Sequence, residues 1–461
     1  MSANSSTRAG DITKFLIRNS ADETKNIDLS AIVQEVSYYE DVFQPSVQVK
    51  ATILESGMTD KPDIGPFGIL NTLPVRGGEP VILKIEDNQD TPNELAFEED
   101  KQIYVNKVSN IDPGTQKDLY NLDFCTKEYL TNNQTRVRKR YDGRVNSNVF
   151  RILRDILGVE EERIDTDTTA IPYNFIGNDK KPFYVCSWLA GKAVPATATE
   201  NGESTIGGAA GYFFYETYDG FKFKAIDTLL SQQYVDPDGK SRNYTKKYIL
   251  TGKPELPESG EYHGKLLSVN IGRFIDLERN LNLGTYANRT IFYNPYGSNY
   301  TVRDYSIGED QKDKVNNAGS QDLDWTAEEF SQTPSRLMSR VLDIGSLPSG
   351  INTRQQLESW KNDPDKPTYD SANAMVQSVM RYNQLFTIKT DVIIPGDFSL
   401  RAGDLIYCDF PTLTAGGTEE VNQETGGIYM IASLCHRLTR EDCFTSLTLV
   451  RDTFGRKPWT D

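Results

Sequence analysis

One pattern of strands occurs twice in the chain, and this duplication constrains the fold more than any other feature. The clearer copy lies between Asp370 and Arg456. There, Asp404–Phe410 is an apolar strand introduced by a glycine. Two further strands follow it, Ile428–Leu438 and Phe444–Arg451, joined by a polar turn around residues 439–442. This order of strands predicts a small antiparallel barrel or sandwich.

The other copy lies in the first third of the chain and has the same order of strand, loop, strand, polar turn and strand. Gly78-Glu79 precedes the apolar strand Pro80–Glu86, as Gly403-Asp404 precedes the strand of the later copy. The likeness is one of pattern rather than of identity. The matching strands are Ile103–Val108 with Ile428–Leu434, and Leu119–Cys125 with Phe444–Val450.

A short helix is expected before the second copy. Met375, Val379, Tyr382 and Phe386 follow helical spacing and form one apolar stripe, and the Ser371 hydroxyl can cap the first turn. The residues that follow, 387–394, are rich in β-branched side chains, and Pro395-Gly396 ends them. We therefore expect one helix laid across the barrel.

The composition favours several β-rich domains. A length of 461 residues predicts two to four domains at about 100–200 residues each. The 24 Tyr and 20 Phe, many in short runs bounded by Gly, Pro or Asn, favour strands. The 50 basic and 66 acidic residues give a net charge of −16, which argues against tight, sequence-reading nucleic-acid binding.

The sequence has no signal for export or for a membrane span. No apolar run reaches 18 residues, and residues 1–10 have no apolar core like that of a secretory signal. Five cysteines at unrelated spacings are therefore expected to be reduced and buried: Cys125, Cys186, Cys408, Cys435 and Cys443.

Between the two copies the pattern changes to mixed helix and strand. We expect a helix capped by Ser147 and ended by Gly158, a second helix that begins near Pro182 and turns Trp188 inward, and a hairpin at residues 212–225. The dense basic cluster lies just before them. An exposed or acid-paired surface is its favoured role, and docking is the alternative. The candidate interface residues are Arg136, Arg138, Lys139 and Arg140.

The sequence offers no catalytic constellation. It contains two histidines, and His436 with Cys435 and Cys443 lacks the ligand spacing of a zinc site, so packing and a surface histidine are expected. No nucleophile elbow, zinc-protease motif or dinucleotide-binding motif occurs. Nothing selects a catalytic pair among the 66 acidic residues. We expect no catalytic residue, no cofactor and no metal.

Several segments together resemble the central baseplate hub proteins of T4-type contractile-tailed bacteriophages. Their order and spacing match across roughly Ile12 to Thr453, while three segments lengthen this chain: Asp87–Asp100, Gly308–Asp324 and Gly345–Tyr369. The resemblance is carried by Lys181–Ala190, Tyr212–Phe223, Pro395–Asp404, Gly427–Ile431 and the final strand.

The resemblance implies a mainly β chain with α+β inserts. It implies two tail-tube-type antiparallel β-barrels per chain, each with a short helix, plus two smaller inserted modules. The expected domains are a disordered lead-in at 1–12, a first barrel at 13–127, an α+β insert at 128–243, a second barrel at 244–300 and 371–455, and a loop-rich module at 301–370.

The resemblance also implies a structural function. Three chains would form a homotrimer whose six barrels make a ring, which joins the tail tube protein on one side to the trimeric spike protein on the other. Neighbouring baseplate wedge proteins would surround it, and DNA would only pass through its channel, whose lining we hypothesise to be acidic. We expect a virion protein of the tail baseplate, assembled in the host cytoplasm, with no membrane insertion.

Two other functions compete with the hub. The same module occurs in type VI secretion and tailocin spikes, which usually continue into a spike domain, whereas this chain ends at Asp461 soon after its barrel. A glycan-binding or glycan-cleaving tail protein is less favoured, because aromatic and acidic residues alone suggest it.

Overall fold

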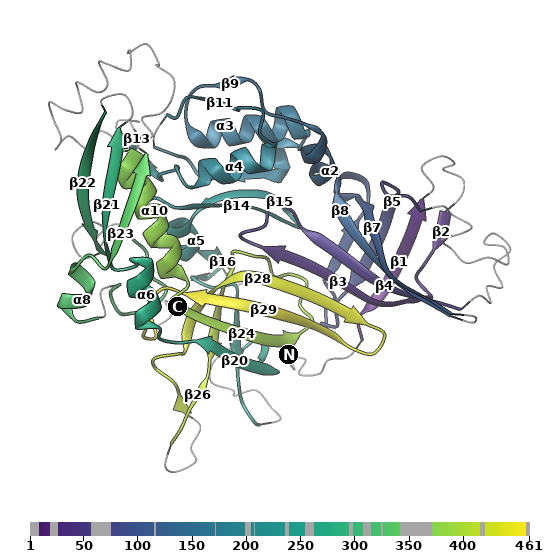
Figure 1. The fold of residues 1–461 in the computed structure, drawn as a ribbon. Helices are drawn as coiled ribbons and strands as arrows, with labels where there is room; N and C mark the ends of the chain where they lie inside the picture. The colour runs from purple at the N-terminus through teal and green to yellow at the C-terminus, as the bar shows by residue number, and fades with distance from the viewer. Residues whose placement is uncertain are drawn as a thin grey trace.

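The two copies of the strand pattern fold into two equivalent blocks of one large sheet (Figure 1). The structure is a computed structural model. It describes residues 9–18, 26–56, 75–114, 117–170, 172–198, 204–206, 208–235, 239–253, 262–294, 298–307, 315–323, 326–341, 371–414 and 420–457.

The first block contains six strands whose order in the sheet differs from their order in the chain. Every neighbouring pair in it is antiparallel. In spatial order, the strands are β1 (Asp11–Arg18), β5 (Pro80–Glu86), β7 (Ile103–Pro113), β8 (Asp118–Thr126), β4 (Gln48–Glu55) and β3 (Val33–Asp41).

The second block repeats this order with six strands from the rest of the chain. All its neighbouring pairs are antiparallel except the first, which is parallel. In spatial order, the strands are β18 (Lys246–Ile249), β25 (Leu405–Asp409), β28 (Gly427–Thr439), β29 (Cys443–Arg451), β24 (Ile388–Pro395) and β20 (Ser268–Arg273).

The two blocks also share a local backbone device. Gly78 and Gly403 both have φ near +90°, and each donates its N–H to the strand that follows next in the sheet. Gly78 bonds to the carbonyl of Val105 at 2.7 Å, and Gly403 to that of Ile431 at 2.8 Å. The hairpin register then shifts by one residue just after Val105 and just after Ile431. The strand correspondence predicted from the sequence is therefore the one that the hydrogen bonds give.

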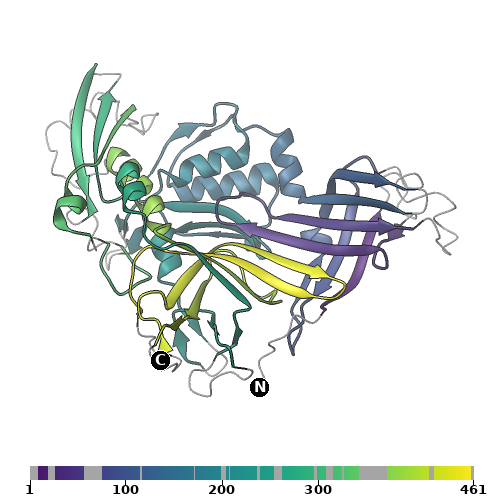
Figure 2. The ribbon, with the colours of Figure 1, turned by 60° about the horizontal axis from the view of Figure 1, so that its bottom comes forward.

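A direct strand pair joins the two blocks into one sheet. Beyond its contact with β25, the second half of β28 pairs antiparallel with β3, from Ser433 opposite Asp41 to Thr439 opposite Glu35. Figure 2 shows the strands of the first block continuing into those of the second. The chain is mainly β, as predicted. The path of paired strands is open at both ends, so the described residues contain no closed barrel.

One hydrophobic core runs under both blocks. It contains Phe15, Val36 and Leu122 from the first and Val392, Ile431 and Leu447 from the second, all almost fully buried. The alternation of buried and exposed side chains along β24 and β29 follows from the period of two in a strand that has one face on the core. The opposite face is open over β24, β29 and the second half of β28, but at β25 and the first half of β28 it is covered, because Leu405 and Met430 join a second buried cluster with Phe213.

The insert between the blocks has its own core, and Phe213 and Tyr215 on its hairpin share a buried cluster with Leu405 and Met430 of the second block. It contains α2 (Lys127–Gln134), α3 (Val145–Ile152), α4 (Pro182–Ala190) and α5 (Ile226–Leu230), and the hairpin of β14 (Tyr212–Thr217) and β15 (Gly220–Ala225). Its shorter elements are β9 (Arg140–Tyr141), η2 (Leu153–Leu157), η3 (Glu161–Arg163), β10 (Ile164–Thr166), β11 (Phe175–Ile176), β12 (Ala196–Ala198) and β13 (Ser204–Ile206).

Two predictions about this insert were wrong. Ser147 does not cap its helix, because α3 already begins at Val145, two residues earlier. Trp188 does not turn fully inward: its ring packs on Tyr173 and Phe175 but remains 37% exposed. Gly158 does end the helical segment, at a φ of +73°.

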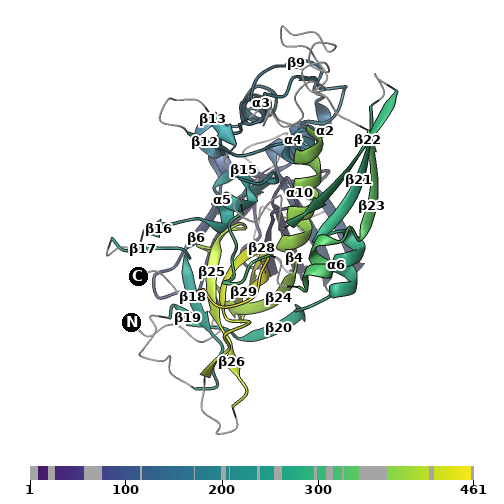
Figure 3. The ribbon, with the colours of Figure 1, turned by 90° about the vertical axis from the view of Figure 1, so that its left-hand side faces the viewer.

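A third group of elements packs against α10 (Ser371–Leu385). Figure 3 shows this helix beside a small sheet of β21 (Ala287–Asn294), β22 (Asn299–Ser306) and β23 (Arg336–Val341). The helix was predicted, but its predicted stripe is only half-buried. Because α10 is covered on more than one side, its fully buried residues are others, Val376, Met380 and Arg381 among them. The remaining elements here are α6 (Leu277–Leu283) and α8 (Glu328–Gln332).

Two of the segments that lengthen the chain are partly buried. Leu95 and Phe97 on β6 (Glu94–Phe97) enter the core because β6 pairs with β5. Asp87 is buried because its carboxylate accepts hydrogen bonds from the Asn93 side chain and the Phe398 backbone. Within residues 315–323, Ala318 and Leu323 are buried. Of the lead-in predicted at 1–12, residues 1–8 lie outside the described residues, and Asp11 and Ile12 belong to β1. The segment 345–369 also lies outside the described residues.

The remaining short strands lie at the margins of the sheet. No helix in the described part of the chain is long and apolar enough to cross a membrane. The short strands are β2 (Asn26–Asp28), β16 (Tyr234–Val235), β17 (Ser241–Arg242), β19 (Gly264–Lys265), β26 (Pro411–Thr412) and β27 (Glu420–Val421), with the 3₁₀ turn η1 (Glu99–Lys101).

Candidate functional site

The open face of the sheet at the junction of the two blocks is the candidate functional site. On β3, Glu35, Ser37 and Tyr39 alternate with the buried Val36 and Tyr38. β28 continues this alternation at the junction, since its polar residues Ser433, Cys435 and Arg437 are the half-buried ones. We call this open surface over β20, β24, β29, β28, β3, β4, β8 and β7 the polar sheet face.

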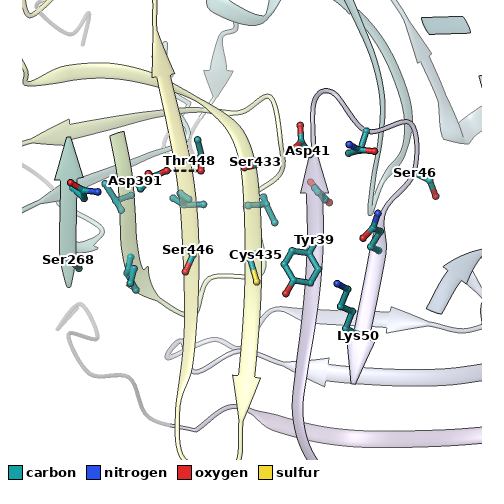
Figure 4. Close-up of a pocket in the computed structure, with 18 residues that line it drawn as sticks. Tyr39, Asp41, Ser46, Lys50, Ser268, Asp391, Ser433, Cys435, Ser446 and Thr448 are labelled. Atoms are coloured by element: carbon teal, nitrogen blue, oxygen red, sulfur yellow. Dashed lines mark hydrogen bonds between the residues drawn. The ribbon is translucent and has the colours of Figure 1, made fainter. Parts of the chain in front are cut away.

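A shallow hollow of about 670 Å³ lies in the polar sheet face where the blocks meet (Figure 4). It reaches from Ser268 on β20 to Lys50 on β4, so both blocks line it. Thr448 donates a hydrogen bond of 2.8 Å to Asp391 across β29 and β24. The Lys50 ammonium lies 5.6 Å from the centre of the Tyr39 ring. Most of the other polar side chains that line the hollow carry hydroxyl or amide groups.

A second hollow of about 330 Å³ continues the polar sheet face over the first block. It shares Tyr39 and Lys50 with the first hollow and extends to Lys107 on β7 and Asp123 on β8. The polar sheet face is therefore one continuous surface over both blocks rather than two separate sites.

The charges on the polar sheet face are balanced. Its acidic side chains are Glu35, Asp41, Asp123 and Asp391, together with Asp112, which lies opposite Leu119 of β8. Lys50 and Lys107 line the same hollows, Arg437 forms an ion pair of 2.6 Å with Glu35, and Lys389 lies two residues from Asp391 on the same side of β24. Arg273 of β20 lies opposite Lys389 on the same face. Five acids thus stand beside five bases, so the excess of acidic residues in the chain does not lie on this surface.

The polar sheet face carries no group arranged for acid–base or metal chemistry. His436 points to the core, where it stacks on Tyr38, so the predicted surface histidine is buried. Burial lowers the pKa of His436 to about 3, which keeps the ring neutral. Burial raises the pKa of the Cys435 thiol. Within the described residues, no three His, Cys, Asp or Glu side chains are placed to hold a metal ion.

A buried carboxylate beneath the polar sheet face ties three parts of the chain together. Glu40 on β3 accepts hydrogen bonds from the Tyr218 N–H at 2.8 Å, the Ala402 N–H at 2.7 Å and the Tyr38 hydroxyl at 2.7 Å. Tyr218 belongs to the tip of the insert hairpin, and Ala402 precedes β25 of the second block. Glu40 therefore holds the insert and the second block against the first.

A buried arginine on α10 makes a similar connection. The Arg381 guanidinium is fully buried and donates to Asp227 on α5 at 3.0 Å and to Asp452 after β29 at 2.8 Å. It also donates to the Asn316 carbonyl at 2.7 Å. Two carboxylates and a carbonyl thus satisfy one planar cation. This arrangement fixes α10 to the insert and to the end of the second block.

A third buried cluster joins the insert to the first block. Glu216 on β14 accepts from the Val47 N–H at 3.1 Å, and its other oxygen lies 3.8 Å from the Arg163 guanidinium. The same guanidinium bonds to Glu128 at 3.2 Å. Burial, and then repulsion from Glu128, raise the pKa of Glu216 to about 8.

The Glu216 cluster predicts a pH dependence of stability. The carboxyl pKa is near 4.5 in the unfolded chain and higher when folded, so the folded state holds an extra proton between these values. This contribution to stability is full below pH 4.5 and is lost as the pH rises through 8. Glu216→Gln mimics the protonated form and should remove this loss. The free energy of unfolding of Glu216→Gln minus that of the unmodified chain should therefore increase from pH 5 to pH 8, by up to about 1.4 kcal/mol per pH unit.

Urea denaturation at pH 5, 6.5 and 8 measures this difference. Asp179→Asn is a matched control, because this exposed carboxylate has its pKa lowered by Arg138 and should show no such gain. A constant difference between Glu216→Gln and the unmodified chain across this range would contradict the prediction.

The four candidate interface residues lie on the insert, away from the polar sheet face. All four are exposed, in the segment that leads into β9. Arg138 pairs with Asp179 at 2.6 Å, and Arg140 pairs with Asp142 at 2.9 Å. Arg136 donates to the carbonyl of Thr135 at 2.7 Å. The acid pairing expected for this cluster is present for two of its members, and its role as an interface stays a prediction.

Sequence reasoning found none of the three buried clusters. Glu40 follows Val36 and Tyr38 at every second position of β3, and these two side chains face the core. An acidic residue on the core-facing side of a strand is a signal that could have identified Glu40. Arg381 follows the buried Met380 in α10, but nothing near it in the sequence names Asp227 and Asp452 as its partners. Contacts between residues this far apart in the chain require the fold.

Comparison with known proteins gives structural neighbours only. No family model matches the chain, and no curated protein matches it. Among solved structures, a tail protein from Neisseria meningitidis MC58 has a TM-score of 0.45 at 8% identity, covering 95% of this chain and 96% of its own. A 43 kDa tail protein of prophage MuSo2 from Shewanella oneidensis has a TM-score of 0.48 at 8% identity, covering 95% and 99%.

A third neighbour comes from a secretion system. The E. coli c3393 protein, a component of the type VI secretion system, has a TM-score of 0.36 at 8% identity, covering 93% of this chain and 76% of its own. These likenesses concern the course of the chain, and no residue role is carried over from them. The structural neighbours of this chain are phage tail and baseplate proteins and type VI secretion proteins, the classes of protein that the sequence resemblance names.

Proposed function

We propose that this chain is the hub subunit of a contractile-tail baseplate, a structural protein whose two blocks form a third of a ring. The observation that supports this most is the junction of β3 and β28, where one block continues into the next by strand pairing. Two equivalent units joined edge to edge are what a ring of alternating blocks needs. Three copies would place six tube-type β-units around one axis.

The polar sheet face is the proposed lining of the channel. Hydroxyl and amide groups with five acids and five bases leave it without net charge. Tight binding of DNA requires an excess of basic side chains that displaces counterions. A balanced surface gives the phosphates no such site, so DNA can pass without being held. The hypothesis of an acidic lining does not fit this surface, and charge balance replaces it.

In the proposed hub, the tail tube protein stacks on one side of the ring and the spike protein on the other, with wedge proteins outside. The first block lies within the domain proposed at 13–127, apart from Asp11 and Ile12 at the start of β1. The second lies within the domain proposed at 244–300 with 371–455, of which β21 belongs instead to the small sheet with β22 and β23. The insert at 128–243 and the module at 301–370 lie outside the ring. The protein would be part of the virion baseplate and would act without catalysis or a cofactor.

The native mass of the purified chain tests the proposal. One chain weighs 51.9 kDa, so light scattering should give about three times this mass if the ring closes with three copies. The measurement should be repeated over a tenfold range of concentration. A mass that stays at one chain, alone and with a co-expressed spike protein, would contradict the proposed hub.

The basic cluster provides a second test. Changing Arg136, Arg138, Lys139 and Arg140 together to Ser should leave the oligomer mass unchanged, because these side chains are exposed on the insert and two of them are paired with acids of the same chain. Light scattering of this variant beside the unmodified chain measures the effect. Dissociation into single chains would place the subunit interface on the insert instead of on the sheet.

A further inference from the structure

Two strand edges of the large sheet have no partner among the described residues. β20 pairs with β24 on one side only. β7 pairs with β5 near its start, at Ile103 and Tyr104, but residues 107–113 pair with β8 alone. An unpaired edge exposes a row of backbone N–H and C=O groups that favours pairing with another strand. Both edges belong to the layer that forms the polar sheet face.

The counterparts of these two edges are paired with each other. By its place in the strand order, β20 corresponds to β3, and the second half of β7 corresponds to the second half of β28. β3 and β28 are the strands that join the blocks, over seven residue pairs. Within the chain, the edges of β3 and β28 are therefore joined. The equivalent edges of β20 and of the second half of β7 are left open.

Burial follows the same division. At the internal junction, Tyr38 and His436 lie opposite each other and are both 0% exposed. At the open edges, Ile271 on β20 is 39% exposed and Ile111 on β7 is 53% exposed. An isoleucine exposed on a strand edge gains from a partner that covers it. The two open edges thus lack the cover that their counterparts give each other.

We propose that β20 of one copy pairs antiparallel with residues 107–113 of β7 in the next copy, so that the internal junction is repeated between subunits. The inference deepens the proposed ring and rests on it. The contact is head to tail, because different edges of the two copies meet, and such contacts close into rings when the rotation allows. The polar sheet face would then continue from copy to copy without a break.

The internal junction also fixes the register between copies. Ser37 pairs with Lys50 on β4, and Asn270 pairs with Asp391 at the matching position of β24. Ser37 and Asn270 are therefore equivalent residues of the two blocks. Phe444 on β29 and Leu119 on β8 are also equivalent residues. Arg437 pairs with Phe444 and Asp112 pairs with Leu119, so Arg437 and Asp112 are equivalent as well. Ser37 lies opposite Arg437 within the chain. Asn270 should therefore lie opposite Asp112 of the next copy.

A cysteine pair tests this register. Directly opposed residues of antiparallel strands have Cα atoms about 4.5–5.5 Å apart, which is within the range of a disulfide. The variant carries Asn270→Cys and Asp112→Cys, with Cys435→Ser to remove the half-buried native thiol. After mild copper oxidation, a non-reducing gel should show most chains as covalent dimers and trimers, which a reductant returns to single chains.

The matched control moves one cysteine by a single strand. Asn270→Cys with Leu119→Cys uses the residue of β8 that lies directly opposite Asp112, on the same face of the first block. In the proposed assembly β7 lies between β8 and the incoming β20, so the Cα atoms would be about 10 Å apart, beyond disulfide reach. This control and both single-cysteine variants should run as single chains.

The outcomes separate the pairing from the ring. A trimer mass by light scattering without the Asn270–Asp112 cross-link would overturn the strand pairing and leave the proposed hub standing. A single-chain mass without the cross-link would overturn both. Equal cross-linking of the test pair and the control pair would also overturn the register, because it would show random collision.

Discussion

Arg381→Ala will lower the free energy of unfolding by about 3–5 kcal/mol, one of the two largest effects expected of the substitutions proposed for this protein. The guanidinium is fully buried between Asp227 and Asp452. Its removal leaves two buried carboxylates without their cationic partner and the Asn316 carbonyl without this donor. The carboxylates must then bind protons or admit water, and either response loosens α10 from the insert. Urea denaturation at neutral pH measures the change.

Arg154→Ala is the matched control for Arg381. Arg154 also bonds to two carboxylates, Asp155 at 2.8 Å and Glu161 at 3.1 Å, but all three side chains are well exposed to solvent. Water replaces the lost partner there, so the denaturation midpoint should stay within error of that of the unmodified chain. Equal loss of stability in the two variants would contradict the role given to burial.

Glu40→Ala should cost a comparable amount, about 3–5 kcal/mol, because it leaves the two N–H groups and the hydroxyl bonded to this carboxylate without an acceptor. The loss should also be local. Hydrogen exchange should accelerate at the hairpin tip around Tyr218 and before β25 at Ala402, since Glu40 bonds to the backbone of both. Denaturation and hydrogen exchange together measure the effect.

Glu35→Ala provides the comparison on the same strand. Glu35 lies on the polar sheet face, where its partner Arg437 is 43% exposed. Its loss should leave exchange at Tyr218 and Ala402 unchanged and should reduce stability far less than Glu40→Ala. If the two variants are equally destabilised, Glu40 does not hold the three parts of the chain together.

The sequence predicted the repeated strands well because their signals are local. Alternating apolar residues and the glycine–acid pairs Gly78-Glu79 and Gly403-Asp404 mark each strand and its start, and the structure bonds the two glycines alike. The hairpin of β21 and β22 was not predicted. Its segment is rich in Asn and Tyr and does not alternate clearly, and its strands are held by pairing with each other and with the distant β23.

The candidate site could be predicted only in part. The polar sheet face depends on β3 and β28, which are nearly 400 residues apart and show no sign of each other in the sequence. The charge of the chain as a whole, −16, also suggested an acidic lining. Net charge does not say where acids lie, and on this surface Glu35 and Asp391 have basic neighbours.

End-on images of the purified oligomer test the central claim most directly, because they show both the number of copies and the repetition within each copy. The proposed ring predicts class averages with three-fold symmetry, six similar units around an open channel, and inserts projecting outward. Three units around a closed centre, or a ring built on any other number of chains, would contradict it.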